Sequence, residues 1–368
     1  MRLSYWERSE VERLRDAIII GAGLVGMSAA IELKRKMPKA SITVIEKQII
    51  GCAASTRNAG FACFGSVSEI LSDIEVYGEQ DTIDLVNKRR SGISSLKTRY
   101  SQDTLGYIAS GGYEIFNNQS EYDKYAGQLS RVNQLLGSDV FERRKTPTPI
   151  KSYERCIFNK YEGQLDTGRF YNALVREARS LDIEVLKGLE VVDIDLARGI
   201  LSCAIEDLTI DMVADKVIIA TNSLTSTLLP QLDVKAVRNQ VILTQKLGNH
   251  EVRGCFHQDK GYIYYRDIGE RILIGGARHL YEDEETGIFG DNPENQDYLL
   301  NHLRKYVLPH VENVRIDQSW SGILSGGTNR MPIVKRLSDK VTVAARLSGM
   351  GVAIGIDVGI EAATLALV

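Results

Sequence analysis

The sequence contains little cysteine, five residues in a chain of 368. They are scattered along the chain as Cys52, Cys63, Cys156, Cys203 and Cys255. No two of them stand at the spacing of metal ligands, and their odd number and irregular spacing suggest no disulfide framework. We therefore expect a reducing, cytoplasmic setting.

Histidine is equally scarce and equally scattered. The five residues are His250, His257, His279, His302 and His310. They show no ligand spacing, so each is expected at the surface rather than in a catalytic role. Without a cluster of cysteine and histidine, we predict no metal site.

Long hydrophobic runs and basic blocks are also absent. No stretch of about 18 apolar residues exists, so we predict no membrane span. Residues 1–16 are charged and polar, which is not the pattern of a signal peptide. The net charge of −3 argues against a nucleic-acid partner. There is no internal repeat, and a chain of this length is expected to form two domains.

A nucleotide-binding pattern lies near the start of the chain. An apolar run over residues 17–20 leads into the loop Gly21-Ala22-Gly23-Leu24-Val25-Gly26, a helical stretch to Lys36 and a second strand over residues 41–45. In such a βαβ unit the first glycine permits a tight turn. The second lets the backbone approach a pyrophosphate, and the third lets helix and strand pack closely. The helix N-terminus offers free N–H groups to the phosphates.

An acidic residue completes this pattern. Glu46 follows the last glycine by about 20 residues, the position from which a carboxylate accepts hydrogen bonds from ribose hydroxyls. Lys47 stands beside it. The sequence therefore predicts a bound dinucleotide, with both residues at its site.

The remaining periodicity predicts an α/β fold, α+β overall. Helices are expected over residues 81–100, 121–136, 165–179 (capped by Asp166 or Thr167), 295–307 and from 351 to the C-terminus. Strands are expected over residues 183–186, 190–194, 216–220 and 341–345, and antiparallel strands over 240–246, 261–266 and 271–276. We therefore expect a Rossmann-like domain, discontinuous in sequence, formed by residues 1–75, 151–230 and 320–368. A mostly antiparallel substrate or cap domain is expected from residues 76–150 and 231–319.

One predicted loop has an unusual composition. Residues 51–65 are rich in small residues, lack helical or strand periodicity and carry little charge, yet they include Phe61 and Phe64. A surface linker is normally more polar. A backbone packed against a flat ligand would explain this composition.

Five segments, in this order, resemble the FAD-dependent D-amino acid oxidase superfamily, which includes glycine oxidase, sarcosine oxidase and gamma-glutamylputrescine oxidoreductase. They are the glycine loop with Glu46, residues 54–60, residues 217–222, residues 271–276, and residues 320–322 leading through 328–332 to 348–351. The resemblance covers nearly the whole chain. The runs at 55–60 and 328–332 look most like the gamma-glutamylputrescine oxidoreductase branch.

The resemblance implies FAD and a role for each matching segment. The glycine loop and Glu46 would hold the pyrophosphate and the adenosine ribose, and Val191 would lie against the adenine. The segment that would pass the pyrophosphate and the flavin edge is Ser55, Thr56, Arg57, Asn58, Ala59 and Gly60. Ala220, Thr221 and Asn222 would close the site. Reduced flavin is negative at its pyrimidine edge. The backbone N–H groups that would face this edge are those of Gly349, Met350, Gly351, Val352, Ala353 and Ile354.

Two departures from the family pattern matter. Sarcosine oxidase-type members attach flavin through a cysteine near the segment matching residues 328–332, whereas the last cysteine here is Cys255. Covalent attachment at that position is therefore excluded. Those enzymes also carry a lysine linked to oxygen reaction, which Leu273 matches here. The electron acceptor stays open between oxygen and another acceptor.

The substrate side is predicted from one strand. Alternation puts Tyr262, Tyr264 and Arg266 on one face. If this face lines the cavity, Arg266 would pair with a substrate carboxylate and a tyrosine would donate to it. The alternative is a solvated outer face. Arg330 has an alternative structural role, holding the cofactor loop to its neighbour.

The sequence therefore predicts an FAD-dependent oxidoreductase that oxidises a C–N bond of a small amine or amino acid. Hydride transfer to flavin N5 would give an imine, and no acid–base dyad is needed for a neutral amine. One alternative is a 2-hydroxy acid or glycerol-phosphate-type dehydrogenase, which would need a base. Another is a non-catalytic FAD-binding redox sensor. NAD in place of FAD is disfavoured, because it would leave residues 349–354 without a role.

Overall fold

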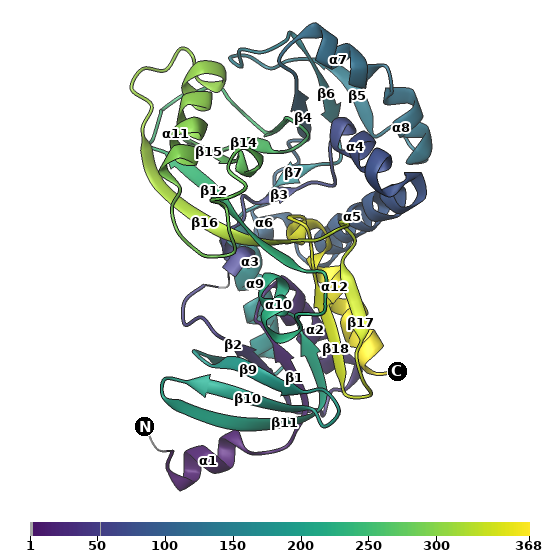
Figure 1. The fold of residues 1–368 in the computed structure, drawn as a ribbon. Helices are drawn as coiled ribbons and strands as arrows, with labels where there is room; N and C mark the ends of the chain where they lie inside the picture. Colours follow the sequence, from purple (N-terminus) through teal and green to yellow (C-terminus); the bar gives the residue numbers. More distant parts are fainter. Residues whose placement is uncertain (1–2, 52) are drawn as a thin grey trace.

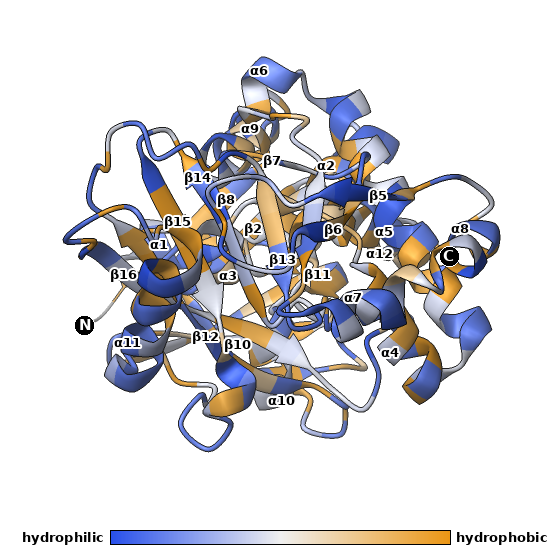
Figure 2. Cartoon of the chain, turned by 90° about the horizontal axis from the view of Figure 1, so that it is seen from above, coloured by the Kyte–Doolittle hydropathy of each residue, from blue (hydrophilic) through white to orange (hydrophobic). Residues whose placement is uncertain are grey.

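Two eight-stranded sheets carry the fold in the residues that the computed structural model describes, 3–51 and 53–368. The sheet that contains β1 occupies the lower half of the molecule in Figure 1 and the other sheet the upper half, with α3 and α9 between them. Hydrophobic residues concentrate on the inner strands, whereas the outer helices carry hydrophilic residues (Figure 2). No helix among the described residues is long and apolar enough to cross a membrane.

The first sheet confirms the predicted nucleotide-binding unit. Its strands run in the order β17 (Ile333–Arg336), β18 (Val341–Ala345), β11 (Leu208–Ile219), β1 (Arg15–Ile20), β2 (Ile42–Glu46) and β8 (Glu184–Lys187). β1 pairs in parallel with both β2 and β11, and β11 with β18. β9 (Glu190–Asp195) and β10 (Ile200–Ile205) extend β11 as an antiparallel ribbon. β1 and β2 are almost wholly buried, as expected for central parallel strands.

Helices α2 (Leu24–Lys36) and α12 (Gly351–Ala366) pack against this sheet and against each other, and α5 (Glu79–Arg99) packs against α12. Glycines let α12 approach α2 and α5 closely. A Cβ on Gly359 would lie 2.5 Å from the carbonyl oxygen of Val25, and one on Gly92 would lie 2.0 Å from that of Ala353. The N-terminus of α12 is therefore held by backbone contact with α5.

The second sheet is mostly antiparallel, as predicted. Its order is β16 (Ile316–Gly326), β12 (Lys235–Thr244), β15 (Arg271–Gly276), β14 (Ile263–Ile268), β13 (Cys255–Gln258), β4 (Gly112–Ile115), β6 (Arg155–Asn159) and β5 (Phe141–Lys145). Only the β13–β4 pair is parallel within the described sheet. Helix α11 (Pro293–His302) and the π-helical turn η3 (Leu303–Val307) contribute apolar residues to the core on this sheet.

Several local predictions need correction. The segment 51–65 contains the short helix α3 (Ala53–Arg57) and the strand β3 (Phe61–Ala62), which pairs with β7 (Gly163–Gln164); Cys52 lies outside the described residues. The helix expected over 121–136 is two helices, α7 (Gln119–Ala126) and α8 (Leu129–Leu135). The first of them ends at its C-cap residue, Gly127. Helix α9 (Thr167–Ser180) is capped by Asp166, whose side chain accepts from the Arg169 N–H.

The remaining short elements complete the chain. They are α1 (Tyr5–Val11), α4 (Val67–Tyr77), α6 (Gln102–Leu105), η1 (Asn222–Leu224), α10 (Thr225–Leu228) and η2 (Arg278–Leu280).

Strand pairing revises part of the predicted division into domains. Residues 151–230 and 320–368 were assigned to the nucleotide-binding domain, yet β6 pairs with β4 and β5, and β16 pairs with β12. Long-range hydrogen bonds, which local sequence does not encode, decide which sheet a strand joins. The other domain limits stay a prediction.

Candidate cofactor and active site

The glycine loop has the geometry that a pyrophosphate needs. Gly21 has φ +100°, and a Cβ there would lie 2.6 Å from the carbonyl oxygen of Ala220. A Cβ on Gly26 would lie 1.9 Å from the carbonyl oxygen of Gly21. Gly23 is the N-cap of α2 and supplies no side-chain cap, so the helix N-terminus stays open to an anion. The flanking residues Ala22, Leu24 and Val25 are buried.

Glu46 ends β2 beside this loop. Its carboxylate is buried and accepts from the N–H of Ala22 at 3.0 Å and of Gln48 at 2.9 Å. Lys47 differs from expectation, because its ammonium pairs with Glu190 at 2.6 Å on the surface. Val191, next to Glu190, is buried in the apolar cluster that also contains Ile20 and Ile45.

The segment from Ser55 to Gly60 is folded onto the same helix end. Ser55 Oγ accepts from the Leu24 N–H at 3.0 Å. Asn58 donates to the carbonyl oxygens of Ala54 and Ser55 and accepts from the Gly60 N–H at 2.9 Å. These contacts shape a tight turn, which Gly60 completes with φ +73°.

The other members of this segment differ in exposure and contacts. Ala59 is buried, and Arg57 is exposed and donates to the carbonyl oxygen of Ser321 at 3.1 Å. Thr56 lies in α3, directly before Arg57.

Two further chain segments complete the predicted cofactor residues. The N–H of Ala220 donates to the carbonyl oxygen of Ile20, and Asn222 accepts from Ser325 Oγ at 2.5 Å. Thr221 shares a hydrogen bond with Thr225. These contacts tie the end of β11 to β1 and to β16.

The second segment, residues 349–354, contains the N-terminus of α12. Its N-cap residue Met350 provides no side-chain cap, and its carbonyl oxygen accepts from Ala353 and Ile354. The N–H groups of Gly351 and Val352 have no acceptor among the described residues, so this helix end can receive a negative charge. Gly349 precedes it with φ +82°.

A cavity of about 340 Å³ lies where two of the predicted cofactor segments meet the second sheet, whereas the glycine loop, Glu46 and residues 220–222 do not line it. One side is formed by the segment from Ala54 to Phe61 and by Met350, the other by β12, β14 and β16. Two buried polar atoms of its lining residues, Ser348 Oγ and Asn239 Oδ1, have no hydrogen-bond partner among the described residues. Unpartnered buried polar atoms and the N-terminus of α12, which has no side-chain cap, fit a polar ligand of the FAD type.

The predicted substrate residues divide between two environments. Tyr262 and Tyr264 line the cavity, and burial raises the pKa of Tyr264 to about 12. Arg266 does not line it. Its guanidinium donates to Gln164 Oε1 and to the carbonyl oxygen of Leu165, both at 3.1 Å, beneath Gly60. The expectation that Arg266 anchors substrate is therefore revised, because both terminal nitrogens hold the Gln164 segment in place.

Other cationic side chains line the cavity, among them Arg278 and Lys260. Arg278 lies over the ring of Tyr262, 5.1 Å from its centroid, and has no acidic partner among the described residues. Arg330 lines the cavity too, but it pairs with Glu69 at 2.8 Å and Asp73 at 3.1 Å, two acids of α4. The role considered for it, holding the cofactor loop to its neighbour, stays a prediction. Burial raises the pKa of Asp73 to about 6.

Sequence reasoning missed a buried cluster at this cavity. His257 Nε2 lies 3.0 Å from Glu162 Oε2, and the Cys63 thiol lies within 4.8 Å of both groups. The expectation that every histidine lies at the surface is wrong for His257, as it is for the buried His250 and His302. β13 has only four residues and all of them are buried, so no alternation in the sequence marks His257.

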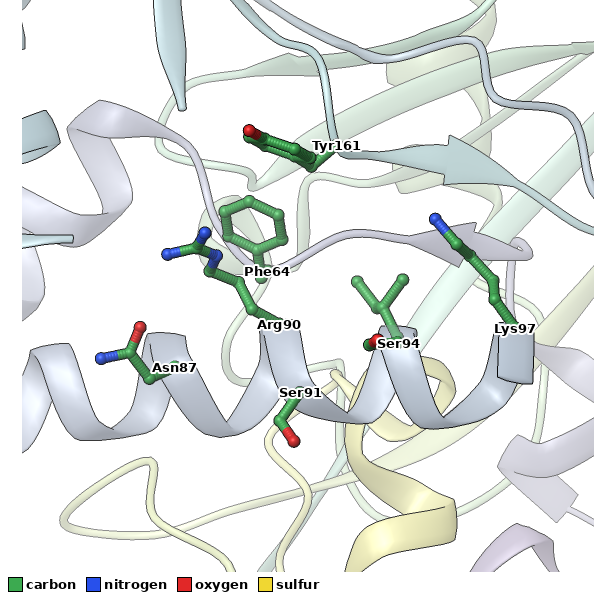
Figure 3. Close-up of a pocket in the computed structure, with 8 residues that line it drawn as sticks. Phe64, Asn87, Arg90, Ser91, Ser94, Lys97 and Tyr161 are labelled. Carbon is green, nitrogen blue, oxygen red and sulfur yellow. The ribbon is translucent and has the colours of Figure 1, made fainter. Parts of the chain in front are cut away.

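A second pocket, also of about 340 Å³, lies behind Phe64. The α5 residues Arg90, Ser94 and Lys97 form one wall and Tyr161 another (Figure 3). Arg90 donates to Leu136 and Ser138 and lies 5.8 Å from the centroids of the Phe64 and Tyr161 rings. None of the predicted cofactor or substrate residues lines this pocket.

Comparison with known proteins gives a family match over most of the chain. The model of the DAO family, described as FAD dependent oxidoreductase, matches residues 16–365. The chain is 24% identical to the probable oxidoreductase OrdL of Haemophilus influenzae, over 92% of this chain and 80% of that protein. It is 20% identical to gamma-glutamylputrescine oxidoreductase of Escherichia coli, over the same shares of the two chains.

Solved structures share the fold. The structure of glycine oxidase from Geobacillus kaustophilus superposes with a TM-score of 0.77, covering 96% of this chain and 95% of that chain. The two are 19% identical in sequence, so this similarity concerns the fold alone.

Proposed function

The chain belongs to the DAO family of FAD-dependent oxidoreductases, and from this we propose that it oxidises a C–N bond of an amine or amino acid. One observation carries the proposal. The cavity is shared between the segments that fit FAD and a wall that bears Tyr262, Tyr264 and an unpaired Arg278. A small substrate in this cavity would touch both.

We propose that FAD is bound noncovalently by the glycine loop, Glu46, the segment from Ser55 to Gly60 and the N-terminus of α12. When bound, FAD supplies the acceptor for a hydride from the carbon beside the substrate nitrogen. No cysteine lies near residues 328–332 to attach it. The protein contributes binding and orientation.

The cavity residues would orient the substrate. Arg278 is placed to pair with an anionic group of the substrate, because its guanidinium pairs with no acid among residues 3–51 and 53–368. Burial raises the pKa of Tyr264 to about 12, so its hydroxyl stays protonated at neutral pH. This hydroxyl accepts from Asn239 Nδ2 at 2.6 Å, and its own proton would be donated to the substrate. The apolar side chains of Val241 and Leu324 would exclude water from the reacting carbon until the imine leaves for hydrolysis.

A second candidate, oxidation of a 2-hydroxy acid, has one observation in its favour. Oxidation of a C–OH group requires a base for the hydroxyl proton. The buried His257, paired with Glu162, lines the cavity and has no partner at Nδ1 among the described residues. An FAD-binding redox sensor without turnover is the candidate of another class.

Anaerobic titration of the yellow holoenzyme separates these functions. Amines, N-substituted amino acids, amino acids and 2-hydroxy acids would be added in turn while flavin absorbance is followed. We expect bleaching by a member of the amine or amino acid group. Bleaching by hydroxy acids alone would replace the proposal, and bleaching by dithionite but by none of these compounds would favour the redox sensor. Reoxidation by oxygen or by an artificial acceptor then identifies the acceptor class.

A further inference from the structure

The buried pair of His257 and Glu162 has no role in the function proposed above. Glu162 is 2% exposed and His257 7%. Glu162 Oε1 also accepts from the Phe64 N–H at 3.1 Å, so its carboxylate is fixed from both sides. Nε2 of His257 faces Glu162, and Nδ1 has no partner among the described residues although the residue lines the cavity.

The surrounding charges favour the protonated ring. Glu114 accepts from the N–H groups of Val67 and Ser68, and Glu69 is held by Arg89 and Arg330. Burial alone would lower the pKa of His257. The charge and hydrogen bond of Glu162, with Glu69 and Glu114 nearby, raise that pKa above its ordinary value.

This cation lies close to the open end of α12. The Cys63 thiol, within 4.8 Å of the His257 and Glu162 groups, also contacts Met350 Sδ at 3.8 Å. Met350 is the N-cap of α12, whose first N–H groups are free. Burial raises the pKa of Cys63 well above its usual range, so the thiol is neutral and cancels none of this positive potential.

We propose that His257, held as an imidazolium by Glu162, is a fixed positive charge that acts together with the α12 N-terminus to stabilise the negative charge of reduced FAD in this cavity. The inference rests on FAD binding in this cavity and not on the identity of the substrate. Charge stabilisation by a preorganised donor in a site without water is strong, because no solvent has to reorganise.

The two-electron midpoint potential of the bound FAD tests this proposal without a substrate. Dye equilibration during reduction of the holoenzyme gives the potential between pH 6 and pH 9. We expect His257→Gln to lower the equilibrium constant for reduction about tenfold near pH 7, which is about 30 mV for a two-electron couple. His302→Gln is the matched control. His302 is also buried and bonded through Nε2, to Gln258, but burial lowers its pKa to about 4, so no charge is lost.

The pH profile separates a charge effect from a structural one. The stabilisation is present while His257 is protonated and is lost as pH rises through its pKa. Glu162→Gln should move this loss to lower pH, and the double variant should resemble His257→Gln. Flavin content and circular dichroism verify that each variant is folded and loaded.

Three results would overturn the inference. One is a wild-type potential in His257→Gln at every pH. Another is an imidazole NMR signal showing His257 neutral at pH 6. The third is a stoichiometric bound metal that Cys63→Ser and His257→Gln both release, because the three side chains would then serve a metal instead of a proton. Failure to find an amine substrate would leave these measurements unaffected.

Discussion

Buried or enclosed cations in this molecule fall into two groups, those with partners and those without. Arg15 and Arg346, both nearly fully buried, are paired with Glu184 and Asp233. Arg278 faces the cavity without an acid among the described residues. Removing a cation from water is costly unless a partner compensates it. Arg278 is half-buried at the cavity, so we take it as the partner of an anionic ligand. The buried Arg266 instead donates to the neutral acceptors Gln164 Oε1 and the Leu165 carbonyl oxygen and serves the fold.

This contrast gives a residue-level prediction. Arg278→Ala should raise the substrate concentration needed for half-maximal flavin bleaching about tenfold or more, since a lost charge-assisted hydrogen bond costs about 1.5–3 kcal/mol. FAD affinity should change little. Arg266→Ala should instead lower the free energy of unfolding measured in urea. If the two variants exchanged these effects, Arg266 would be the substrate anchor after all.

A buried histidine gives a prediction about pH and stability. Burial lowers the pKa of His302 to about 4, from 6.5 for an exposed histidine. As pH falls from about 6.5 to 4, His302 becomes protonated in the unfolded chain but not in the folded protein. The residue therefore lowers the free energy of unfolding over this range. The full difference corresponds to roughly 3 kcal/mol. Urea unfolding at pH 7 and pH 4.5 should show a smaller loss in His302→Gln than in the wild type. Equal losses would contradict the assignment of a neutral buried ring.

At the level of elements, helix α12 connects packing to cofactor binding. Its N-terminus faces the cavity, while Gly92 of α5 lies against the carbonyl oxygen of Ala353 in its first turn. Helix position and helix-end electrostatics are therefore coupled. A shift of α12 would move the free N–H groups away from the ligand.

Substitution at this contact should reveal the coupling. Gly92→Ala places a Cβ 2.0 Å from the Ala353 carbonyl oxygen, so α5 and α12 must separate. We expect a loss of about 1–3 kcal/mol in unfolding free energy together with weaker FAD binding, measured by flavin fluorescence. Ser91→Ala, at the exposed neighbouring position of the same helix, is the control. Unchanged FAD affinity in Gly92→Ala would show that the packing of α12 does not affect cofactor binding.

Elements differ in how far the sequence predicts them. The strand, loop and helix around Gly21, Gly23 and Gly26 are local in sequence, so spacing alone predicts them. His257 and Glu162 are 95 residues apart and meet only when β13 packs beside β4. No periodicity encodes such a pair, and no rule of alternation shows that Arg266 lies beneath Gly60 instead of facing the cavity.

On the scale of the whole molecule, the cavity belongs to neither sheet alone. Its walls come from the segment 54–61, from residues 348–352 after the last strand of the first sheet, and from strands β12, β14 and β16 of the second. A ligand there bridges both halves seen in Figure 1. Cofactor binding and overall stability are therefore linked.

Removal of FAD should accordingly lower the midpoint of thermal unfolding. A ligand present at about 1,000 times its dissociation constant stabilises the folded state by about 4 kcal/mol when it does not bind the unfolded chain. The comparison is thermal unfolding of the holoenzyme and of protein stripped by chaotropic dialysis. Acid precipitation of the holoenzyme should release all yellow colour. Colour retained by the pellet, or equal midpoints, would contradict noncovalent binding at the boundary of the sheets.

The parallel core joins strands from distant parts of the chain, and this has a consequence for biosynthesis. β2 ends at Glu46, whereas β18 begins at Val341. At about 5–20 residues per second, a ribosome needs on the order of 15–60 s to translate the intervening stretch. Until β18 and α12 are translated, β11 lacks its neighbour on one side, and the apolar core that α12 shares with β1 and β2 stays incomplete. The part of the cavity formed by the α12 N-terminus can therefore be completed only after residues 351–366 have been translated.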